Sequence, residues 1–198
     1  MRTVAQNIYS FIELSESAKE KAIQNQRNYE QENYSPDELL KEFSEELSNN
    51  GFLKSKIYYS GFCSQGDGLS FDSEIDLKFF VVKHKDRLPL LFKRVDRLDD
   101  YIEAAIYKNS YANHYSHRKT RYTEVTTQVN TDPRVDKLLN REVITLDELV
   151  DFDRLAFCDK FYRELEIDYD RAMDDDSIIE TLKANDYEFL RDGEIYIG

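Results

Sequence analysis

A pair of glycines between two aromatic-rich runs constrains the fold of this chain more than any other feature. Gly66 and Gly68 lie within the stretch Ile57–Phe71, where they bracket one acidic residue. The run before the glycines is rich in Tyr and Phe, and apolar and polar residues alternate after them. This pattern predicts two antiparallel strands joined by a tight turn in which the glycine backbone adopts positive φ.

The tip of this predicted hairpin is a candidate binding loop. Its polar side chains and bare backbone N–H groups would project from the end of the strands, where they could hold an anion or contact a partner. Glycine and aspartate are also ordinary turn formers, so the same residues could form a turn and nothing more. The candidate loop consists of Ser64, Gln65, Gly66, Asp67 and Gly68.

The order of the expected elements indicates an α+β fold with a mostly antiparallel sheet. Ser35-Pro36 begins one helix and Asn50-Gly51 ends it, while Asp192-Gly193 predicts a C-terminal hairpin. Strands are also expected at 3–12, 52–63, 69–83 and 110–130, and helices at 16–32, 36–50, 88–107, 146–172 and 174–184. The order β-α-α-β-β-α-β-α-α-β-β suits one domain, residues 1–198, in which 145–198 could form a helical and hairpin subdomain.

The charge balance restricts the partners that the chain can bind. It has 40 acidic and 27 basic residues, a net charge of −13. Such a surface repels nucleic-acid backbones and anionic membranes, so neither is an expected partner. A protein with a basic surface is favoured instead, by plain complementarity or by mimicry of nucleic acid. The alternative, that the charge serves only solubility, stays open, as does self-association.

The C-terminal helices carry the candidate acidic interaction face. Carboxylates spaced along a helix can imitate a row of phosphates, although a solvated helix face has the same composition. Three consecutive acidic residues follow the longest expected helix, and further carboxylates precede them. The candidate face consists of Glu166, Asp170, Asp174, Asp175 and Asp176.

A second acidic set is expected to pair with the one basic island of the chain. Asp72, Glu74 and Asp76 alternate along the strand predicted at 69–83, so they would share its solvated face. The island Tyr107–Tyr122 interleaves Tyr with Arg118, Lys119 and Arg121. That composition could stack on nucleic acid, but salt bridges to the acidic strand explain it better in so acidic a chain.

No sequence motif in the chain supports a metal or cofactor site. His114 and His117 are three apart in a β-like segment, which would direct the two rings to opposite faces. The glycine pair lacks the third glycine and the helix of a dinucleotide fingerprint. No cofactor and no metal are therefore expected. The alternative function is a small hydrolase or nucleotide-responsive enzyme with Asp67 at the hairpin tip, near His117 and Arg118.

The two cysteines, Cys63 and Cys158, both lie beside apolar residues. We expect both thiols to be buried and free, as in a reducing cytoplasm. No apolar segment of signal-peptide or membrane-spanning length is found.

Three blocks of the sequence resemble a family of functionally uncharacterised proteins from bacteriophages and other bacterial mobile elements. They are Phe11–Ala22, Tyr59–Phe71, and Tyr162–Tyr169 continued by Glu180–Phe189 and Asp192-Gly193. The middle block, with its Ser-Gly-Phe-x-Ser-Gln-Gly-Asp-Gly signature, is the most specific. Asp72-Ser73 departs from the small residue and Thr-Gly that the family has after Phe71, so the second strand is expected to run straighter.

The resemblance implies a setting and brings no activity with it. A phage-borne accessory gene is expressed in the bacterial cytoplasm, and small acidic proteins of this kind often bind and inhibit host defence proteins. We therefore expect an inhibitor of the anti-CRISPR or anti-restriction type, which would present the Gln65–Gly68 loop and the acidic helix face to its target.

Overall fold

A computed structural model describes residues 6–100, 102–108, 116–127 and 133–197, with the backbone alone at 133–138. Helices and short antiparallel strands make up an α+β fold, as the sequence predicts. The strands form three separate two-stranded ladders within the described residues, in place of one sheet. The chain divides into two compact units. Unit 1 comprises residues 1–36 and 166–198, and unit 2 comprises residues 37–165.

The elements of unit 2 are α2 (Asp37–Asn49), β2 (Phe52–Ser60), β3 (Gly68–Ile75), α3 (Leu77–Lys83), α4 (Pro89–Phe92), η2 (Val95–Asp100), β4 (Ile102–Lys108), η3 (Arg118–Thr120) and β5 (Arg121–Thr127). Those of unit 1 are β1 (Tyr9–Ser10), η1 (Phe11–Glu13), α1 (Glu16–Asn33), α6 (Asp175–Ala184) and β6 (Glu188–Phe189). Helix α5 (Pro133–Met173) belongs to unit 2 as far as Leu165 and to unit 1 beyond it.

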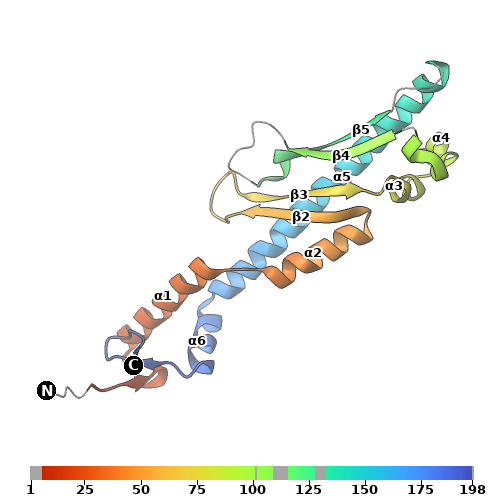
Figure 1. The fold of residues 1–198 in the computed structure, drawn as a ribbon. Coiled ribbons are helices and arrows are strands. Elements are labelled where there is room, and N and C mark those ends of the chain that lie inside the picture. The colour runs from red at the N-terminus through yellow and green to blue at the C-terminus, as the bar shows by residue number, and fades with distance from the viewer. Residues whose placement is uncertain (1–5, 101, 109–115, 128–132, 198) are drawn as a thin grey trace. The chain divides into compact units, whose positions relative to one another are not determined.

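Unit 2 packs two β-hairpins and their helices around an aromatic core. β2 pairs with β3 and β4 pairs with β5, and α5 passes behind both pairs in Figure 1. Phe43 of α2 stacks on Phe161 of α5 with ring centroids 4.1 Å apart, and Phe52 of β2 meets Phe71 and Phe80 edge to face. Each of these five rings is almost fully buried, so aromatic packing joins the helices to the strands.

Unit 1 has a smaller core of its own, between α1, α6 and the chain termini. Its buried side chains are Phe11, Leu14, Ala18, Ala22, Ile178, Leu182 and Phe189. The two alanines let other groups approach α1 closely. A Cβ added to Gly193, whose φ is +88°, would lie 2.1 Å from the carbonyl oxygen of Ala18. The C-terminal turn therefore lies directly against the backbone of α1, and only glycine fits there.

Three local predictions are confirmed by the backbone. Gly51 has φ +87° at the end of α2, and Asp174 caps α6 by accepting a hydrogen bond from the Asp176 amide. The turn at Asp192-Gly193 closes through the Leu190 amide, which donates to the Glu194 carbonyl at 2.7 Å, although β6 is only two residues long. Each of these signals depends on residues within a few positions of one another.

The strand predicted at 69–83 is wrong beyond Ile75. Asp76 accepts a hydrogen bond from the Phe79 amide at 2.9 Å and so caps α3. Phe80 and Val81 are fully buried on the inner face of this helix. The apolar residues from Leu77 onward fit helical spacing as well as strand alternation, and the cap decides between them.

The helix predicted at 88–107 is also wrong. Only α4 and the 3₁₀ turns of η2 are helical, and Ile102 begins β4, which pairs along its length with β5. Leu91, Leu98 and Ile102 are buried as expected, but they come from three different elements. The spacing of apolar residues therefore identified core positions and not the element that presents them.

Three other elements differ from their predicted bounds within the described residues. The strand predicted at 3–12 is reduced to the two residues of β1, followed by a 3₁₀ turn. Within the segment predicted at 110–130, the strand β5 covers 121–127, and 109–115 and 128–132 lie outside the described residues. Thr145 does not begin a helix: α5 starts at Pro133, and the Thr145 hydroxyl donates to the Arg141 carbonyl inside it.

Candidate functional site

The carboxylate of Asp67 closes the candidate loop on itself. It accepts hydrogen bonds from the backbone amides of Cys63 and Ser64 at 2.9 and 2.7 Å, and the Asp67 amide donates to the Ser64 carbonyl at 3.0 Å. The sequence predicts bare backbone N–H groups at the tip, but these two amides already donate hydrogen bonds to Asp67. The loop already contains its own anion, so a second anion would have to displace the Asp67 carboxylate.

Neither glycine of the loop adopts the left-handed conformation that the sequence predicts. The only positive-φ glycines among the described residues are Gly51 and Gly193. Gly68 is required for a different reason, because a Cβ there would lie 3.0 Å from Cα of His117. The absence of a side chain thus lets the start of β3 approach the turn at 116–120.

Aromatic contacts fix the base of the loop on α5. The Tyr162 hydroxyl donates to the carbonyl of Gly61 at 2.9 Å, and the ring of Phe62 stacks between Tyr59 and Tyr162. Ser64 and Gln65 remain exposed at the tip. The loop is therefore a fixed projection with two accessible polar side chains.

His117 lies beside the start of β3, where the alternative enzyme function would need it. Its Nδ1 accepts a hydrogen bond from the Lys119 amide at 3.2 Å and caps η3. Desolvation, helped by Arg118 and Lys119, lowers the pKa of this imidazole, so the neutral form is favoured. His114 lies outside the described residues.

The acidic strand and the basic island meet as predicted, but through one main pair. Arg121, which is 7% exposed, forms an ion pair with Asp72 and lies over the ring of Tyr58, 4.8 Å from its centroid. Glu74 pairs instead with Lys54, and Asp76 caps α3. These acidic residues have partners within the fold, so they do not form a free acidic stripe.

Arg118 of the basic island is held by α5. Arg118 forms an ion pair with Asp159, and the Arg118 carbonyl accepts a hydrogen bond from Arg154 at 2.9 Å. Arg154 is 2% exposed and pairs with Asp151 one turn earlier. An arginine thus occupies a core position of α5 and ties the turn at 116–120 to the helix.

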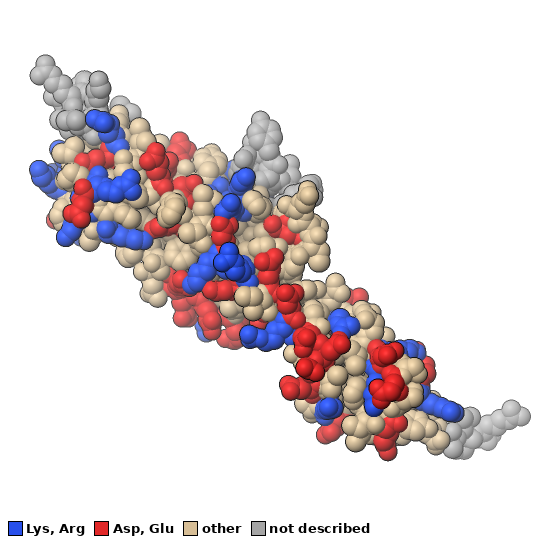
Figure 2. Space-filling view, turned by 180° about the vertical axis from the view of Figure 1, so that it is seen from behind, with Lys and Arg blue, Asp and Glu red and all other residues tan. Residues whose placement is uncertain are grey.

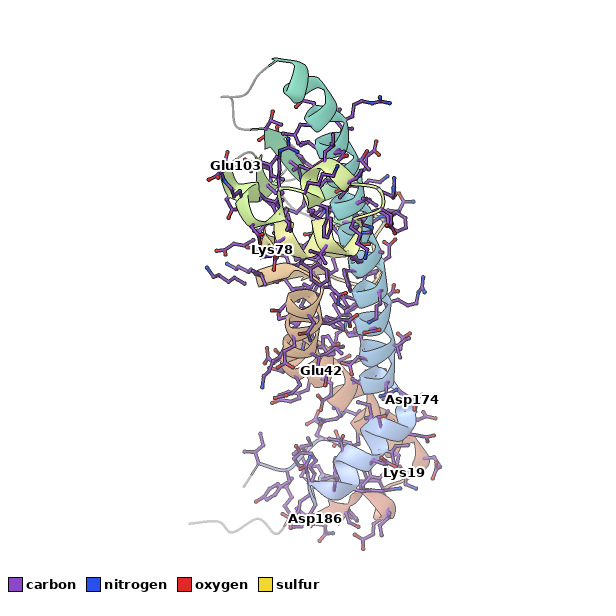
Figure 3. All side chains as sticks on the ribbon, turned by 90° about the vertical axis from the view of Figure 1, so that its right-hand side faces the viewer. Lys19, Glu42, Lys78, Glu103, Asp174 and Asp186 are labelled. Atoms are coloured by element: carbon purple, nitrogen blue, oxygen red, sulfur yellow. The ribbon has the colours of Figure 1, made fainter. Side chains whose placement is uncertain are left out.

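The candidate acidic face lies entirely within unit 1, and its residues differ in what they do. Asp174 caps α6, at the position labelled in Figure 3, and Asp175 forms an ion pair with Arg27 of α1. Asp170 and Asp176 are exposed, and Glu166 is half-buried. Two of the five carboxylates therefore stabilise unit 1, and three remain as candidates for contact with a partner.

The negative charge is divided unequally between the units. Unit 1 has 16 acidic and 7 basic residues, a net charge of −9, and unit 2 has 24 and 20, a net charge of −4. Figure 2 shows carboxylates in adjoining groups with lysine and arginine among them. About a third of the chain thus carries most of the excess charge.

The sequence did not identify the exposed aromatic ring of α5. Phe152 lies among the apolar residues of the helix predicted at 146–172, where a buried position is expected, yet it is 70% exposed. The buried stripe consists of Leu139, Val143, Leu146, Val150, Arg154, Cys158, Phe161 and Leu165, at spacings of three and four. Phe152 falls outside this stripe, and because the stripe includes Arg154, the spacing of apolar residues in the sequence does not reveal which face is internal.

The cysteines differ from each other. Cys158 is buried as expected, and burial raises the pKa of its thiol to about 12. Cys63 is exposed in the loop, so its predicted burial is wrong. Both thiols are free. Across the described ranges, no group of three or more His, Cys, Asp or Glu side chains could hold a metal ion, and no helix has the length and apolar character to cross a membrane.

Comparison with known proteins gives one match. The model of a family described as a domain of unknown function (DUF8835) matches residues 35–175. That range contains all of unit 2 and the last turns of α5. No curated protein and no solved structure matches the chain.

Proposed function

This chain belongs to the family described as a domain of unknown function, DUF8835, and we propose that it is a protein-binding module whose acidic unit 1 contacts a basic surface of a partner protein. The observation that carries the proposal is the concentration of charge in unit 1. A net charge of −9 on 69 residues lies just above the magnitude of about 2 to 8 that is usual for a small soluble domain, and it is more than twice the net charge of the larger unit 2.

The carboxylates that would contact the partner protein are those that neither cap a helix nor form an ion pair within the described part of unit 1. Asp170 and Asp176 of the candidate face are exposed, and so is Glu180 of α6, whereas Glu166 is half-buried and is left out of the test. A row of such groups attracts a basic surface over a distance of about a Debye length, roughly 8 Å at physiological salt. Charge of this kind raises the association rate more than the final affinity, and its effect falls steeply as salt is added.

The loop Ser64–Gly68 of unit 2 is the second contact in this proposal. Its base is fixed by Tyr162 and Phe62, so little conformational entropy would be lost when Ser64 and Gln65 meet a partner. Replacing Gln65 with Ala should weaken binding without altering the fold.

The biological setting belongs to the proposal as well. The phage resemblance supports an accessory protein that acts in the bacterial cytoplasm by binding a host defence protein. Defence proteins that handle nucleic acid have basic surfaces, so a carboxylate surface can occupy them in place of phosphates. An inhibitor of the anti-CRISPR or anti-restriction type would act in this way.

The test is retention of partners from a bacterial lysate on the full chain at low and at high salt. We expect a basic protein to be retained at low salt and released at high salt. The triple variant Asp170→Lys, Asp176→Lys, Glu180→Lys should lose it, because these residues have no partner to lose within unit 1 among the contacts found in the described residues.

The matched control reverses three exposed carboxylates of unit 2: Glu42→Lys, Asp99→Lys and Glu103→Lys. Figure 3 labels Glu42 on α2 and Glu103 on β4. The control has the same net charge as the test variant and should retain the partner. Equal loss in both variants would attribute binding to net charge alone, and retention of the partner by the unit 1 variant would refute the proposal.

A further inference from the structure

Phe152 stands between two hollows on the surface of unit 2. It is 70% exposed, and Ile144, eight residues earlier on α5, is 60% exposed. The ring lines a hollow of about 380 Å³ on one side and another of about 310 Å³ on the other. A large aromatic side chain held out of the core between two hollows is typical of a protein contact site.

The larger hollow is bounded by two aromatic rings and three carboxylates. Tyr122 of β5 and Phe152 provide the rings, and both are exposed. Asp147, Glu148 and Asp151 from α5 provide the carboxylates. Among the described residues that line this hollow there is no lysine or arginine. Its walls are therefore apolar and aromatic, and its charge is wholly negative.

The three carboxylates differ in their availability. Asp151 pairs with the buried Arg154, and Asp147 accepts a hydrogen bond from the Val125 amide at 3.0 Å. Glu148 is exposed, lines both hollows, and has no hydrogen bond or ion pair among the described residues. A cation entering the larger hollow would thus find Glu148 free.

Asp147 and Thr123 of the larger hollow lose contact with water without gaining a full set of hydrogen bonds. Burial raises the pKa of Asp147, partly offset by the Val125 amide and by the nearby Thr123 hydroxyl. The Thr123 oxygen is buried, yet it forms no hydrogen bond of normal geometry in the described part of the chain. An incoming N–H donor could satisfy this hydroxyl and stabilise the charge on Asp147.

The smaller hollow has a different character. His84, Arg87 and Asp153 line it together with Phe152 and Glu148. Asp153 is already paired with Lys83 at 2.6 Å, and Nε2 of His84 is buried without a hydrogen-bond partner among the described residues. Because its charges are mixed, this hollow selects no charged ligand, and it suits a polar or apolar neighbour of a residue in the larger one.

We propose that the hollow between Tyr122 and Phe152 receives an arginine or lysine side chain from a partner protein. The apolar stem would lie along Phe152 and Tyr122, and the charged head would reach Glu148 and Asp147. Arginine fits better than lysine, because a flat guanidinium stacks on aromatic rings and offers several N–H donors. An apolar residue next to it would cover Phe152.

This site goes beyond the acidic surface of unit 1 and does not depend on it. It lies in unit 2, within the part of the chain that defines the family. Its selectivity comes from a shaped hollow with aromatic walls, whereas the unit 1 surface relies on charge. The two proposals can therefore fail separately.

The test is selection of short random peptides, displayed on mRNA, for binding to the full chain. We expect the recovered peptides to share an Arg or Lys beside a large apolar residue. Citrulline has nearly the shape of arginine without its charge, so replacing the selected arginine with it should weaken binding about tenfold or more. Glu148→Lys and Phe152→Ala should each weaken binding by a similar factor.

The control variants are Glu42→Lys, for the charge, and Ile167→Ala, for an exposed apolar residue of unit 1. Both should bind the selected peptides as the unmodified chain does. Because Glu148 and Phe152 are exposed, their replacement should leave the thermal unfolding curve unchanged. If one of these two substitutions unfolds the chain, the other substitution and the citrulline peptide still test whether the hollow binds a basic side chain.

Several outcomes would overturn the proposal. Peptides without a basic residue, no recovered peptide at all, or unchanged affinity of both Glu148→Lys and Phe152→Ala would each do so. Sedimentation equilibrium adds one more. A dimer of the unmodified chain that Phe152→Ala dissociates would identify a second copy of this chain as the occupant, in place of a partner protein.

Discussion

The two units use charge and apolar surface in opposite ways. Unit 2 buries a large aromatic core and is nearly balanced in charge, with 24 acidic and 20 basic residues, and several of its carboxylates cap helices or pair with arginine and lysine. Unit 1 has a small core in which two alanines of α1 replace bulky side chains, and its acidic residues outnumber its basic ones by more than two to one. Unit 2 thus has the larger buried core, and unit 1 has the larger excess of negative charge.

Helix α5 takes part in both units, and its sequence changes character where it passes from one to the other. Leu165 is the last residue of its buried stripe in unit 2. Beyond it, Asp168 accepts a hydrogen bond from the Tyr34 hydroxyl at 2.8 Å, and the rings of Tyr34 and Tyr169 meet edge to face. One continuous helix therefore contributes leucine and phenylalanine to one core and polar and aromatic contacts to the other unit.

The largest expected effects come from one phenylalanine in each core. Phe161→Ala should destabilise unit 2 and Phe189→Ala should destabilise unit 1, each by about 3 to 5 kcal/mol, since both rings are fully buried. Amide hydrogen exchange, read separately over the two units, should show the loss of protection in the unit that carries the substitution.

This pair of variants also tests whether the two units unfold independently. If Phe189→Ala lowers protection equally in both units, the chain unfolds as one cooperative body, and the units are not independent in stability. The exposed Phe92→Ala is the control and should change protection in neither.

Glycines at positive φ give the next largest effect. Gly193→Ala should cost about 2 to 4 kcal/mol, because the new Cβ meets the Ala18 carbonyl oxygen in addition to the strain of the left-handed backbone. Gly51→Ala is the matched variant in unit 2. There the nearest atoms belong to side chains, Cδ1 of Phe79 at 2.6 Å and Cε2 of Phe80 at 2.9 Å, which shift more readily than the backbone carbonyl of a helix, so the cost should be smaller. Equal losses in denaturant unfolding would contradict this distinction.

A smaller effect is expected where the loop meets α5. Tyr162→Phe removes the hydrogen bond to the Gly61 carbonyl and should cost about 0.5 to 1 kcal/mol. Hydrogen exchange at the Cys63 and Ser64 amides should accelerate, while exchange in unit 1 stays the same. Tyr59→Phe keeps the stacked ring and serves as control. Unchanged exchange at these two amides would mean that the Asp67 carboxylate alone holds the loop.

Local signals were sufficient to predict the ends of several elements. The helices predicted from 16 and 174 begin where Ser15 caps α1 and Asp174 caps α6, and Gly51 and Gly193 adopt the left-handed backbone that their positions predict. Each depends on contacts within a few residues, which the sequence displays directly.

Long-range contacts decided the elements that the sequence did not predict. Ile102 and its neighbours fit the apolar spacing of a helix, but pairing with the strand that ends at Thr127 makes them β4. In the same way, Gly66-Asp67-Gly68 has the composition of a positive-φ turn, yet the Asp67 carboxylate and the approach of His117 fix a different backbone. Tertiary contacts of this kind override local propensity.

The candidate sites show the same limit. The acidic residues at 166–176 were identified from the sequence, but their division into structural and free carboxylates depends on Arg27, which is about 150 positions away. Phe152 was assigned to the core because apolar residues are dense along α5, and only the burial of Arg154 in the stripe shows which face is internal. The sequence therefore shows where acidic residues are concentrated, and only the fold shows which of their carboxylates have no partner within the described residues.

The smallest expected effect compares one carboxylate from each unit. Burial raises the pKa of Asp147 in unit 2, so its ionised form is less stable in the folded chain than in the unfolded one. Asp147→Asn should therefore stabilise the chain at neutral pH. The gain should shrink as the pH falls through the raised pKa of Asp147, where the unmodified chain takes up a proton. Thermal unfolding at neutral and acidic pH measures this difference.

Asp170→Asn in unit 1 is the matched variant, and it should leave stability within about 0.5 kcal/mol at every pH, because this carboxylate is exposed to water. A loss of stability in Asp147→Asn at neutral pH would mean that the charged hydrogen bond to Val125 outweighs the cost of burial. In that case the carboxylate would be a structural group of unit 2. A gain would show a charge kept at a cost in stability, as a binding site requires.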